Sequence, residues 1–145
     1  MSNSGGTPFA TTAHIRDHCL CLHVQRAARA LARRFDAALR PLNLTNGQFS
    51  LLMSLNRPQP ASLGSVAALL AMDRTTLTAA LKPLKRRRLV RVIPDPADTR
   101  ACLLTLTRTG RTLLARAVPV WERTHASLDF LLGGNNLRSK LRALS

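Results

Sequence analysis

Two short helical patterns separated by a three-residue break constrain the fold of this chain more than any other feature. Over residues 62–70, and again from residue 74 to about residue 88, apolar residues recur at the spacing of a helix that buries one side. They are Leu63, Val66, Leu69 and Leu70 in the first pattern, and Leu77, Leu81 and Leu84 in the second. Asp73 ends the break and is a good N-cap, because its carboxylate accepts free amide hydrogens of the following turn. Two helices joined by a tight turn predict a helix-turn-helix, whose second helix enters the major groove of DNA.

The outward side of the second helix carries hydroxyl and basic side chains. The candidate contacts are Arg74, Thr75, Thr76, Thr78, Lys82 and Arg86. We expect Arg74 and Thr75 to read bases, Lys82 to contact a phosphate, and Thr76 to do either. The plainer alternative is an ordinary solvated helix face, and the flanking helix-turn-helix pattern favours DNA contact over it.

The charge of the chain points to a polyanionic partner. The formal net charge is +15, from 22 Lys and Arg against 7 Asp and Glu, and 19 of the 22 cations are Arg. Arg presents planar, paired donors that suit phosphates and guanine edges. A generic basic surface or a membrane-binding amphipathic helix would have a similar balance, so charge alone does not select DNA.

The sequence favours a cytoplasmic protein without a membrane partner. No apolar stretch is long enough to span a bilayer, and no N-terminal apolar run follows a basic segment. The three cysteines are an odd count, which argues against a secreted disulfide framework.

Helical patterns flank the helix-turn-helix on both sides. Residues 1–11 are predicted to be disordered, and a long helix should then run from about Thr12 to Arg40, where Pro41 ends it. A helix of that length is hard to bury within one small domain, so we expect it to pack partly on another subunit. Residues 45–48 match a capping box, with Thr45 and Gln48 at the two positions, and a mostly buried helix should follow.

A hairpin is predicted after the second helix of the helix-turn-helix. Residues 89–93 and 100–106 read as strands, and residues 94–99 read as the turn between them. Thr107 should cap a last long helix over about 108–132, which Pro119 should kink. Gly133 and Gly134 then break the chain before a short terminal helix. The predicted fold is mainly α with a small β-hairpin wing, divided into dimerisation regions at 12–44 and 108–145 and a winged helix-turn-helix at 45–107.

This order of elements resembles the MarR family of winged-helix transcriptional regulators, from about Ala13 to the C-terminus. The likeness rests on Leu44-Thr-Asn-Gly-Gln48, Asp73-Arg-Thr-Thr-Leu-Thr78, Leu89-Val-Arg91, Asp98-Thr-Arg100, and Leu104-Thr-Leu-Thr107 followed by Gly110. The resemblance implies a homodimer, held by the first and last helices, on a pseudo-palindromic site in double-stranded DNA. It also implies that Arg100 enters the minor groove from the wing and that Asp98 helps to hold it. Arg88 stands where the family usually has glycine, which suits a left-handed residue after a helix.

Cys21 is a candidate redox sensor. Its spacing to Thr45 resembles that of the organic-hydroperoxide sensors of the same family, whose first helix carries a reactive cysteine. Phe35 and Asn46 stand where those sensors have tyrosines near the thiol, and the chain has no Tyr. Three nearby imidazoles and many Arg could still favour the thiolate. The alternative is a buried structural cysteine at an interface. Phe35 and Asn46 remain candidates for lining an effector pocket.

Metal binding and catalysis have weaker support. His14, His18 and Cys21 are spaced so that one helical face could hold all three near zinc or copper, but frayed, exposed histidines explain the same pattern. We predict no metal, no cofactor and no enzymatic activity, because paired carboxylates, a glycine-rich phosphate loop and a nucleophile motif are all missing from the sequence.

The sequence therefore predicts a homodimeric DNA-binding regulator, more a repressor than an activator, released from its operator by a small-molecule effector or by oxidation. The first alternative is a non-specific architectural DNA-binding protein, which needs the same charge but no reading residues. A second alternative is an interaction module that uses its amphipathic helices on a partner other than DNA.

Overall fold

The computed structural model describes residues 5–133 and 136–145, and it divides the chain into two compact units, Met1–Arg34 and Phe35–Ser145. The first holds α1 (Phe9–His18) and the larger part of α2 (Leu20–Leu39). Residues 1–4 of the segment predicted to be disordered, and Gly134 of the predicted glycine break, lie outside the described residues.

The prediction of one unbroken helix over about Thr12–Arg40 was wrong. The chain is already helical from Phe9, and the helix is interrupted at Cys19, whose ψ of 109° is extended. His18 and Cys19 are both poor helix formers, so the backbone gives way there at low cost. The Cys19 sulfur then accepts a hydrogen bond from the Leu22 amide at 3.5 Å, in the manner of an N-cap for the next helix.

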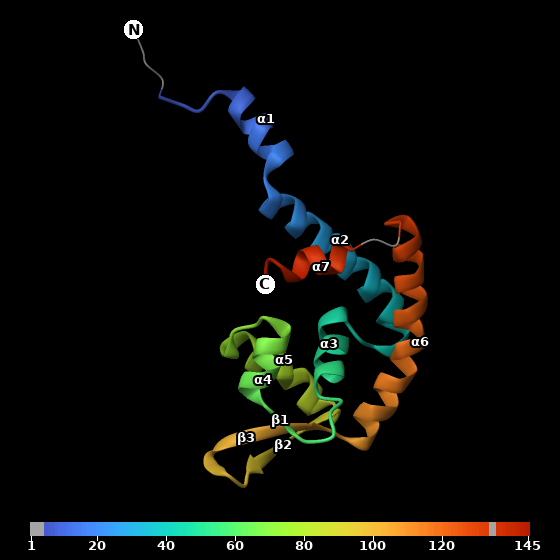
Figure 1. Cartoon of the computed structure of the whole chain (residues 1–145). Helices are drawn as coiled ribbons and strands as arrows, with labels where there is room; N and C mark the ends of the chain where they lie inside the picture. Colours follow the sequence, from blue (N-terminus) through green and yellow to red (C-terminus); the bar gives the residue numbers. More distant parts are fainter. Residues whose placement is uncertain (1–4, 134–135) are drawn as a thin grey trace. The chain divides into compact units, whose positions relative to one another are not determined.

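The second unit is a mostly helical fold with a small antiparallel sheet, as predicted (Figure 1). Its elements after the end of α2 are η1 (Arg40–Leu42), α3 (Asn46–Ser54), β1 (Ala61–Ser62), α4 (Leu63–Leu70), α5 (Arg74–Arg86), β2 (Val90–Asp95), β3 (Asp98–Leu106), α6 (Arg108–Leu131) and α7 (Leu137–Arg142). Side chains from α3, α4, α5, the sheet and α6 meet in one core, in which Leu52, Val66, Leu77 and Leu84 are fully buried. This core fixes the helix-turn-helix against the wing.

Side-chain caps begin each of the main helices of this unit. Thr45 and Gln48 form the predicted capping box of α3, Asp73 accepts from the Thr76 amide to start α5, and Thr107 caps α6. Ser62 caps α4 in the same way. Because each cap satisfies amides that the helix itself leaves unpaired, these polar residues set the helix boundaries that the sequence predicted.

The sheet has one strand more than predicted. β1 pairs with β3 through Ala61 and Leu104, and β2 pairs with β3 from Val90 opposite Leu106 onward, so the strand order is β1-β3-β2. The turn is also tighter than the predicted six residues, because pairing continues to Asp95 opposite Asp98. The first apolar pattern needs a correction too, since Leu69 is 57% exposed while Val66 carries the buried contact of α4.

Among the residues that the structure describes, three other than glycine adopt a left-handed backbone, and all three follow helices. Asn43, Ala71 and Arg88 have φ of 54°, 52° and 55°. At the end of α5, the Arg88 amide donates to the Lys85 carbonyl and the Leu89 amide donates to the Leu84 carbonyl, both at 3.0 Å. These are the two hydrogen bonds of a Schellman motif, so the helix ends as it would with glycine although the position is Arg.

Replacement of Arg88 by glycine is expected to raise the free energy of unfolding by about 1 kcal/mol, because glycine adopts the left-handed conformation without the clash of a Cβ. The midpoint of urea unfolding measures it. Arg86→Gly is the matched control, since it removes the same charge from the last helical turn of α5 and should destabilise by a similar amount. If the Arg88→Gly protein is no more stable than the unchanged protein, the left-handed backbone of Arg88 does not cost stability.

The junction between β2 and α6 is unusually tight. The Thr107 hydroxyl donates to the Arg88 carbonyl at 2.7 Å, and its oxygen accepts from the Gly110 amide at 3.0 Å. A Cβ atom placed on Gly110 would lie 2.1 Å from the Leu89 carbonyl oxygen. Only glycine therefore fits at the first turn of α6, where the helix packs on the backbone that follows α5.

Candidate nucleic-acid interface

Helix α5 is anchored by one side and presents the other to solvent. Leu77, Leu81 and Leu84 are at most 2% exposed, and they hold the helix against the core. All six predicted contact residues lie on the exposed side: Arg74, Thr75, Thr76, Thr78, Lys82 and Arg86. All six side chains are therefore open to solvent on this helix, and their contact with DNA stays a prediction.

Two of the three threonine hydroxyls on this surface are engaged within the helix. The Thr76 hydroxyl donates to a carboxylate oxygen of Asp73 at 2.7 Å, and the Thr78 hydroxyl donates to the Arg74 carbonyl at 2.8 Å. Hydrogen bonds from the Thr76 amide and then from its hydroxyl hold the pKa of Asp73 below its usual range. Thr76 thus supports the start of the helix, while the adjacent Thr75 is exposed.

The wing extends beside this helix as the hairpin of β2 and β3. At its tip, a carboxylate oxygen of Asp98 accepts from the backbone amide of Arg100 at 3.0 Å. The resemblance implied that Asp98 holds the arginine, and the hydrogen bond that the structure describes is to the Arg100 backbone. Arg100 is exposed, so its guanidinium is accessible to a ligand.

A hollow of about 560 Å³ lies between the helix-turn-helix and the wing. Its basic lining residues are Arg74 and Lys85 of α5 and Arg100 of β3, and Asp98 is the acidic one. A Cβ on Gly64 of α4 would lie 3.2 Å from an Nη of Arg74, so glycine leaves the room in which that guanidinium rests. Helix α5, the second helix of the helix-turn-helix, and the wing therefore border the same positively charged hollow. Such a hollow suits the phosphate backbone of a nucleic acid strand.

Sequence reasoning did not assign Lys85 and Gly64 to the site. Lys85 belongs to the basic run Lys85-Arg-Arg-Arg88, which is visible in the sequence, but its place beside the wing depends on how β3 packs on α4. Gly64 gives no sequence signal, because its effect is to leave space for a side chain ten positions away.

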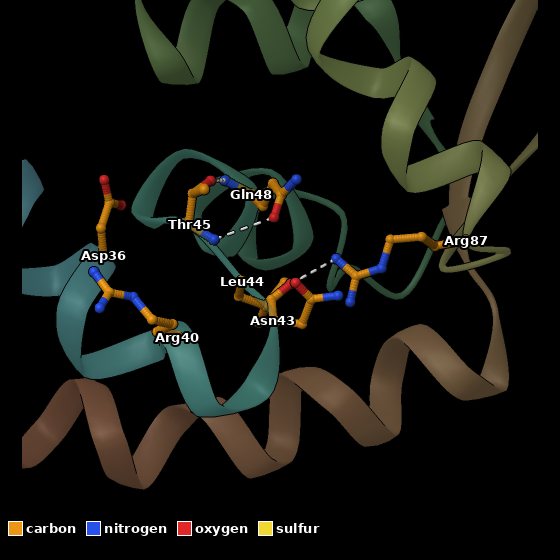
Figure 2. Close-up of a pocket in the computed structure, with 7 residues that line it drawn as sticks. All are labelled: Asp36, Arg40, Asn43, Leu44, Thr45, Gln48 and Arg87. Atoms are coloured by element: carbon orange, nitrogen blue, oxygen red, sulfur yellow. Dashed lines mark hydrogen bonds between the residues drawn. The ribbon is translucent and has the colours of Figure 1, made fainter.

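A second, polar hollow of about 350 Å³ lies at the start of α3 (Figure 2). Figure 2 shows Arg40 and Arg87 on opposite sides of it, with Asn43, Thr45 and Gln48 between them. An Nη of Arg87 donates to the Asn43 carbonyl at 2.7 Å, which ties the end of α5 to the turn before α3. The residues of this hollow therefore also hold the end of α5 against the turn before α3.

Comparison with known proteins decides the family. The MarR family model matches residues 44–102. The transcriptional regulator MosR of M. tuberculosis, solved in complex with DNA, is 38% identical, with 88% of this chain and 93% of that chain covered and a TM-score of 0.81. This chain belongs to the MarR family.

Curated MarR-type relatives align over less of their length. The transcriptional repressor NicR of Pseudomonas putida is 36% identical over 52% of this chain and 48% of its own. The transcriptional activatory protein BadR of Rhodopseudomonas palustris is 33% identical over 71% of this chain and 57% of its own. The chain thus spans about half the length of these curated relatives. Over the described residues, the MarR-family chain has no helix both long and apolar enough to cross a membrane.

Cys21, the candidate redox residue of this MarR-family chain, lies on the first turn of α2 and is exposed. The Gln25 side-chain amide donates to its sulfur at 3.3 Å. The alternative interpretation expected a cysteine buried at an interface, and within its own unit the thiol is open to solvent. Cys19 and Cys102 are also free thiols.

The three candidate metal ligands, His14, His18 and Cys21, do not lie on one continuous helical face. The rings of His14 and His18 stack with centroids 4.2 Å apart, and Nδ1 of His18 donates to the His14 carbonyl at 2.8 Å. Cys21 follows the break at Cys19, so the helical face that would have joined the three residues is interrupted. Within residues 5–133 and 136–145, no group of three His, Cys, Asp or Glu side chains is placed to hold a metal ion.

Phe35 and Asn46, the candidate effector-pocket residues, contact different partners. Phe35 is buried, and its ring centroid lies 4.9 Å from that of His125, whose pKa is lowered chiefly by burial. Asn46 donates to Asp36 from its backbone amide at 2.7 Å and from its side chain at 2.9 Å, which lowers the pKa of Asp36. Neither is among the seven residues that line the hollow of Figure 2, and their role in effector binding stays a prediction.

Proposed function

We propose that the protein is a homodimeric transcriptional regulator that represses genes by binding a pseudo-palindromic operator in double-stranded DNA. The observation that carries this proposal is the shared cationic hollow between α5 and the wing, bordered by Arg74, Lys85 and Arg100. Helix α5 would enter the major groove and Arg100 the adjacent minor groove, while Lys82 contacts phosphate. The net charge of +15 supports a strong, salt-dependent attraction to the duplex.

Exposed apolar side chains support assembly into a dimer. In the first unit Phe9 is 78% exposed and Leu20 62%, and near the C-terminus Phe130 is 91% and Leu131 70% exposed. Apolar residues in such number are rarely left to water by a monomer. A second copy that covers regions 12–44 and 108–145 would bury them. It would place the two winged helix-turn-helix regions, residues 45–107, with their α5 helices roughly 34 Å apart.

Release from the operator would follow from a change in that spacing. A small molecule, or oxidation of Cys21, would stabilise a spacing of the two winged units that no longer matches the DNA repeat. Either signal works only if it binds or favours the non-binding form more strongly than the binding form. The name of the relative NicR supports repression, while the name of BadR keeps activation as the alternative sign of control.

Selection of bound sequences from random duplexes, with and without an organic hydroperoxide, tests the proposal. We expect enrichment of an inverted repeat whose half-sites lie about one DNA turn apart. A labelled copy of that duplex should then resist competition by random DNA. Equal competition by random DNA would instead favour a non-specific architectural protein, and the absence of duplex binding would favour an interaction module.

Replacement of Cys21 by serine is expected to abolish release of the selected duplex by hydroperoxide while leaving duplex affinity unchanged within about twofold. The readout is gel-shift or anisotropy titration before and after oxidant. Cys102→Ser is the control, because Cys102 is another exposed free thiol and should still allow release. Since Cys102 also lines the hollow between α5 and the wing, release is compared with the affinity of the same variant before oxidant is added. If the Cys21→Ser protein releases DNA as the unchanged protein does, the thiol is not the sensor.

A further inference from the structure

Helix α7 (Leu137–Arg142), which follows α6 in the chain, has no buried residue (Figure 1). Leu137 and Leu141 are each 41% exposed, and Leu144 is 64% exposed. In the described part of the chain, every hydrogen bond between α7 and α6 comes from the guanidinium of Arg138. The attachment of α7 to α6 therefore depends on one polar side chain, because no residue of α7 belongs to the apolar core.

Arg138 contacts two groups of α6 with the same nitrogen. One Nη lies 2.9 Å from a carboxylate oxygen of Asp129 and 3.2 Å from Nδ1 of His125. Together these three residues form the α6–α7 contact. Arginine only donates, so Nδ1 of the neutral imidazole accepts the hydrogen bond and the ring proton lies on Nε2. The α6–α7 contact thus requires an uncharged His125.

The imidazole of His125 lies against aromatic rings. Its centroid is 4.9 Å from that of Phe35 of α2 and 4.4 Å from that of Trp121, one turn earlier on α6. Neither ring is charged, so the charged groups that act on the imidazole are Arg138 from α7 and Asp129 from its own helix. Burial lowers the pKa of His125 most, Arg138 lowers it further, and Asp129 raises it. The ring is therefore neutral at neutral pH and becomes charged only below the ordinary histidine pKa of about 6.5.

Protonation of His125 reverses its interaction with Arg138. Nδ1 then carries a hydrogen and cannot accept, and two cations stand 3.2 Å apart. The attraction of Asp129 for the new charge is the smaller effect. The remaining pair of Arg138 and Asp129 has side chains that are 59% and 49% exposed, and an exposed ion pair contributes little. Acid therefore removes an attraction between α7 and α6 and adds a repulsion.

We propose that the α6–α7 contact is a pH-sensitive switch, in which neutral His125 holds α7 on α6 through Arg138 and protonated His125 releases it. The switch stands on these contacts alone. Its meaning for transcription rests on the proposed function, in which region 108–145 helps to hold the dimer. Release of α7 would then move its exposed leucines away from the second copy and weaken operator binding at acidic pH.

The fluorescence of Trp121 tests the titration of His125. Trp121 is the only tryptophan of the chain, and a cation that forms against the indole ring changes its emission. Titration of the full chain from about pH 8 to about pH 4.5 should change the emission in one step, with a midpoint below the ordinary histidine pKa. His125→Gln should remove the step. The matched control is the triple variant His14→Gln, His18→Gln, His23→Gln, which leaves His125 as the only imidazole and should keep the step.

Two charge variants of α7 test the pairing with Arg138. Arg138→Gln removes the cation that opposes protonation of His125, so the midpoint of the Trp121 step should rise. Arg142→Gln removes a cation from the same helix outside the α6–α7 contact and should leave the midpoint unchanged. Equal midpoints in these two variants would show that Arg138 does not act on His125, and would overturn the proposal.

Hydrogen exchange of the α7 amides measures release. After correction for the pH dependence of exchange itself, the protection of α7 should fall by at least about threefold from the neutral to the acidic side of the Trp121 step. In His125→Gln the protection should be equal on both sides, and in the triple histidine variant it should fall as in the unchanged protein. A Trp121 step without loss of α7 protection would overturn the switch. If His125→Gln shows a lower melting temperature, Arg138→Gln carries the test, because its α7 should be poorly protected on both sides of the step.

Affinity for the selected operator duplex, measured on both sides of the step, relates the switch to the proposed function. Acid adds charge at all four histidines, which by itself strengthens attraction to DNA. The unchanged protein should nevertheless lose affinity on acidification relative to His125→Gln, by at least about threefold. Equal affinity changes in both proteins would overturn the effect on operator binding. If Trp121 and α7 respond as expected but no duplex is selected, the proposed function fails while the switch stands.

Discussion

Gly110→Ala is expected to lower the free energy of unfolding by about 3 kcal/mol or more. The new Cβ would lie 2.1 Å from the Leu89 carbonyl oxygen, and that neighbour is backbone. Leu89 is held by the helix-ending hydrogen bond from its amide to the Leu84 carbonyl, so it cannot move away cheaply. Urea unfolding followed by circular dichroism measures the loss.

Gly47→Ala is the control for this prediction. Gly47 also lies in the first turn of a helix, α3, but the nearest atom to an added Cβ is the Thr45 hydroxyl oxygen at 3.9 Å. Alanine there should stabilise by up to about 1 kcal/mol, because it is the better helix former. Similar stability changes for the two variants would show that the contact of Gly110 with Leu89 is not the cause.

The double replacement Lys82→Ala, Arg100→Ala is expected to weaken binding of the selected duplex by about 100-fold or more. Both side chains are exposed, one on α5 and one on the wing, so their loss should not disturb the fold. A dimer would lose each contact twice. The salt dependence should also become shallower, by about one unit of slope for each phosphate contact removed.

Arg111→Ala, Arg123→Ala is the charge-matched control for that experiment. It removes two cations from exposed positions of α6 and should lower duplex affinity only through the change in net charge. Measurement by fluorescence anisotropy at several salt concentrations separates the two variants. Equal losses of affinity in both variants would mean that overall charge attracts DNA and that Lys82 and Arg100 make no specific contact with it.

Local patterns predicted the winged helix-turn-helix well, because its boundaries are set by local chemistry. Caps at Thr45, Ser62, Asp73 and Thr107 are properties of a few neighbouring residues, and all four formed. The break at Cys19 was missed because no Pro or Gly stands near it to mark the end of a helix. Strand β1 was missed because two residues are too few to show alternation.

The candidate site could be predicted where it depends on one helix and not where it depends on packing. The exposed side of α5 follows from the spacing of Leu77, Leu81 and Leu84 alone. The hollow that joins Arg74 with Arg100 depends on β3 lying against α4, and no spacing in the sequence encodes that distance.

Helices α4 and α5 both end on residues that pass through the left-handed region without being glycine, Ala71 at φ 52° and Arg88 at φ 55°. Each holds a conformation that costs an L-residue about 1–2 kcal/mol. The second unit is thus less stable than it would be with glycine at these two positions. A single amino-acid change at either one would remove that cost. A variant whose new ligand or operator preference lowers its stability could therefore regain stability through glycine at position 71 or 88.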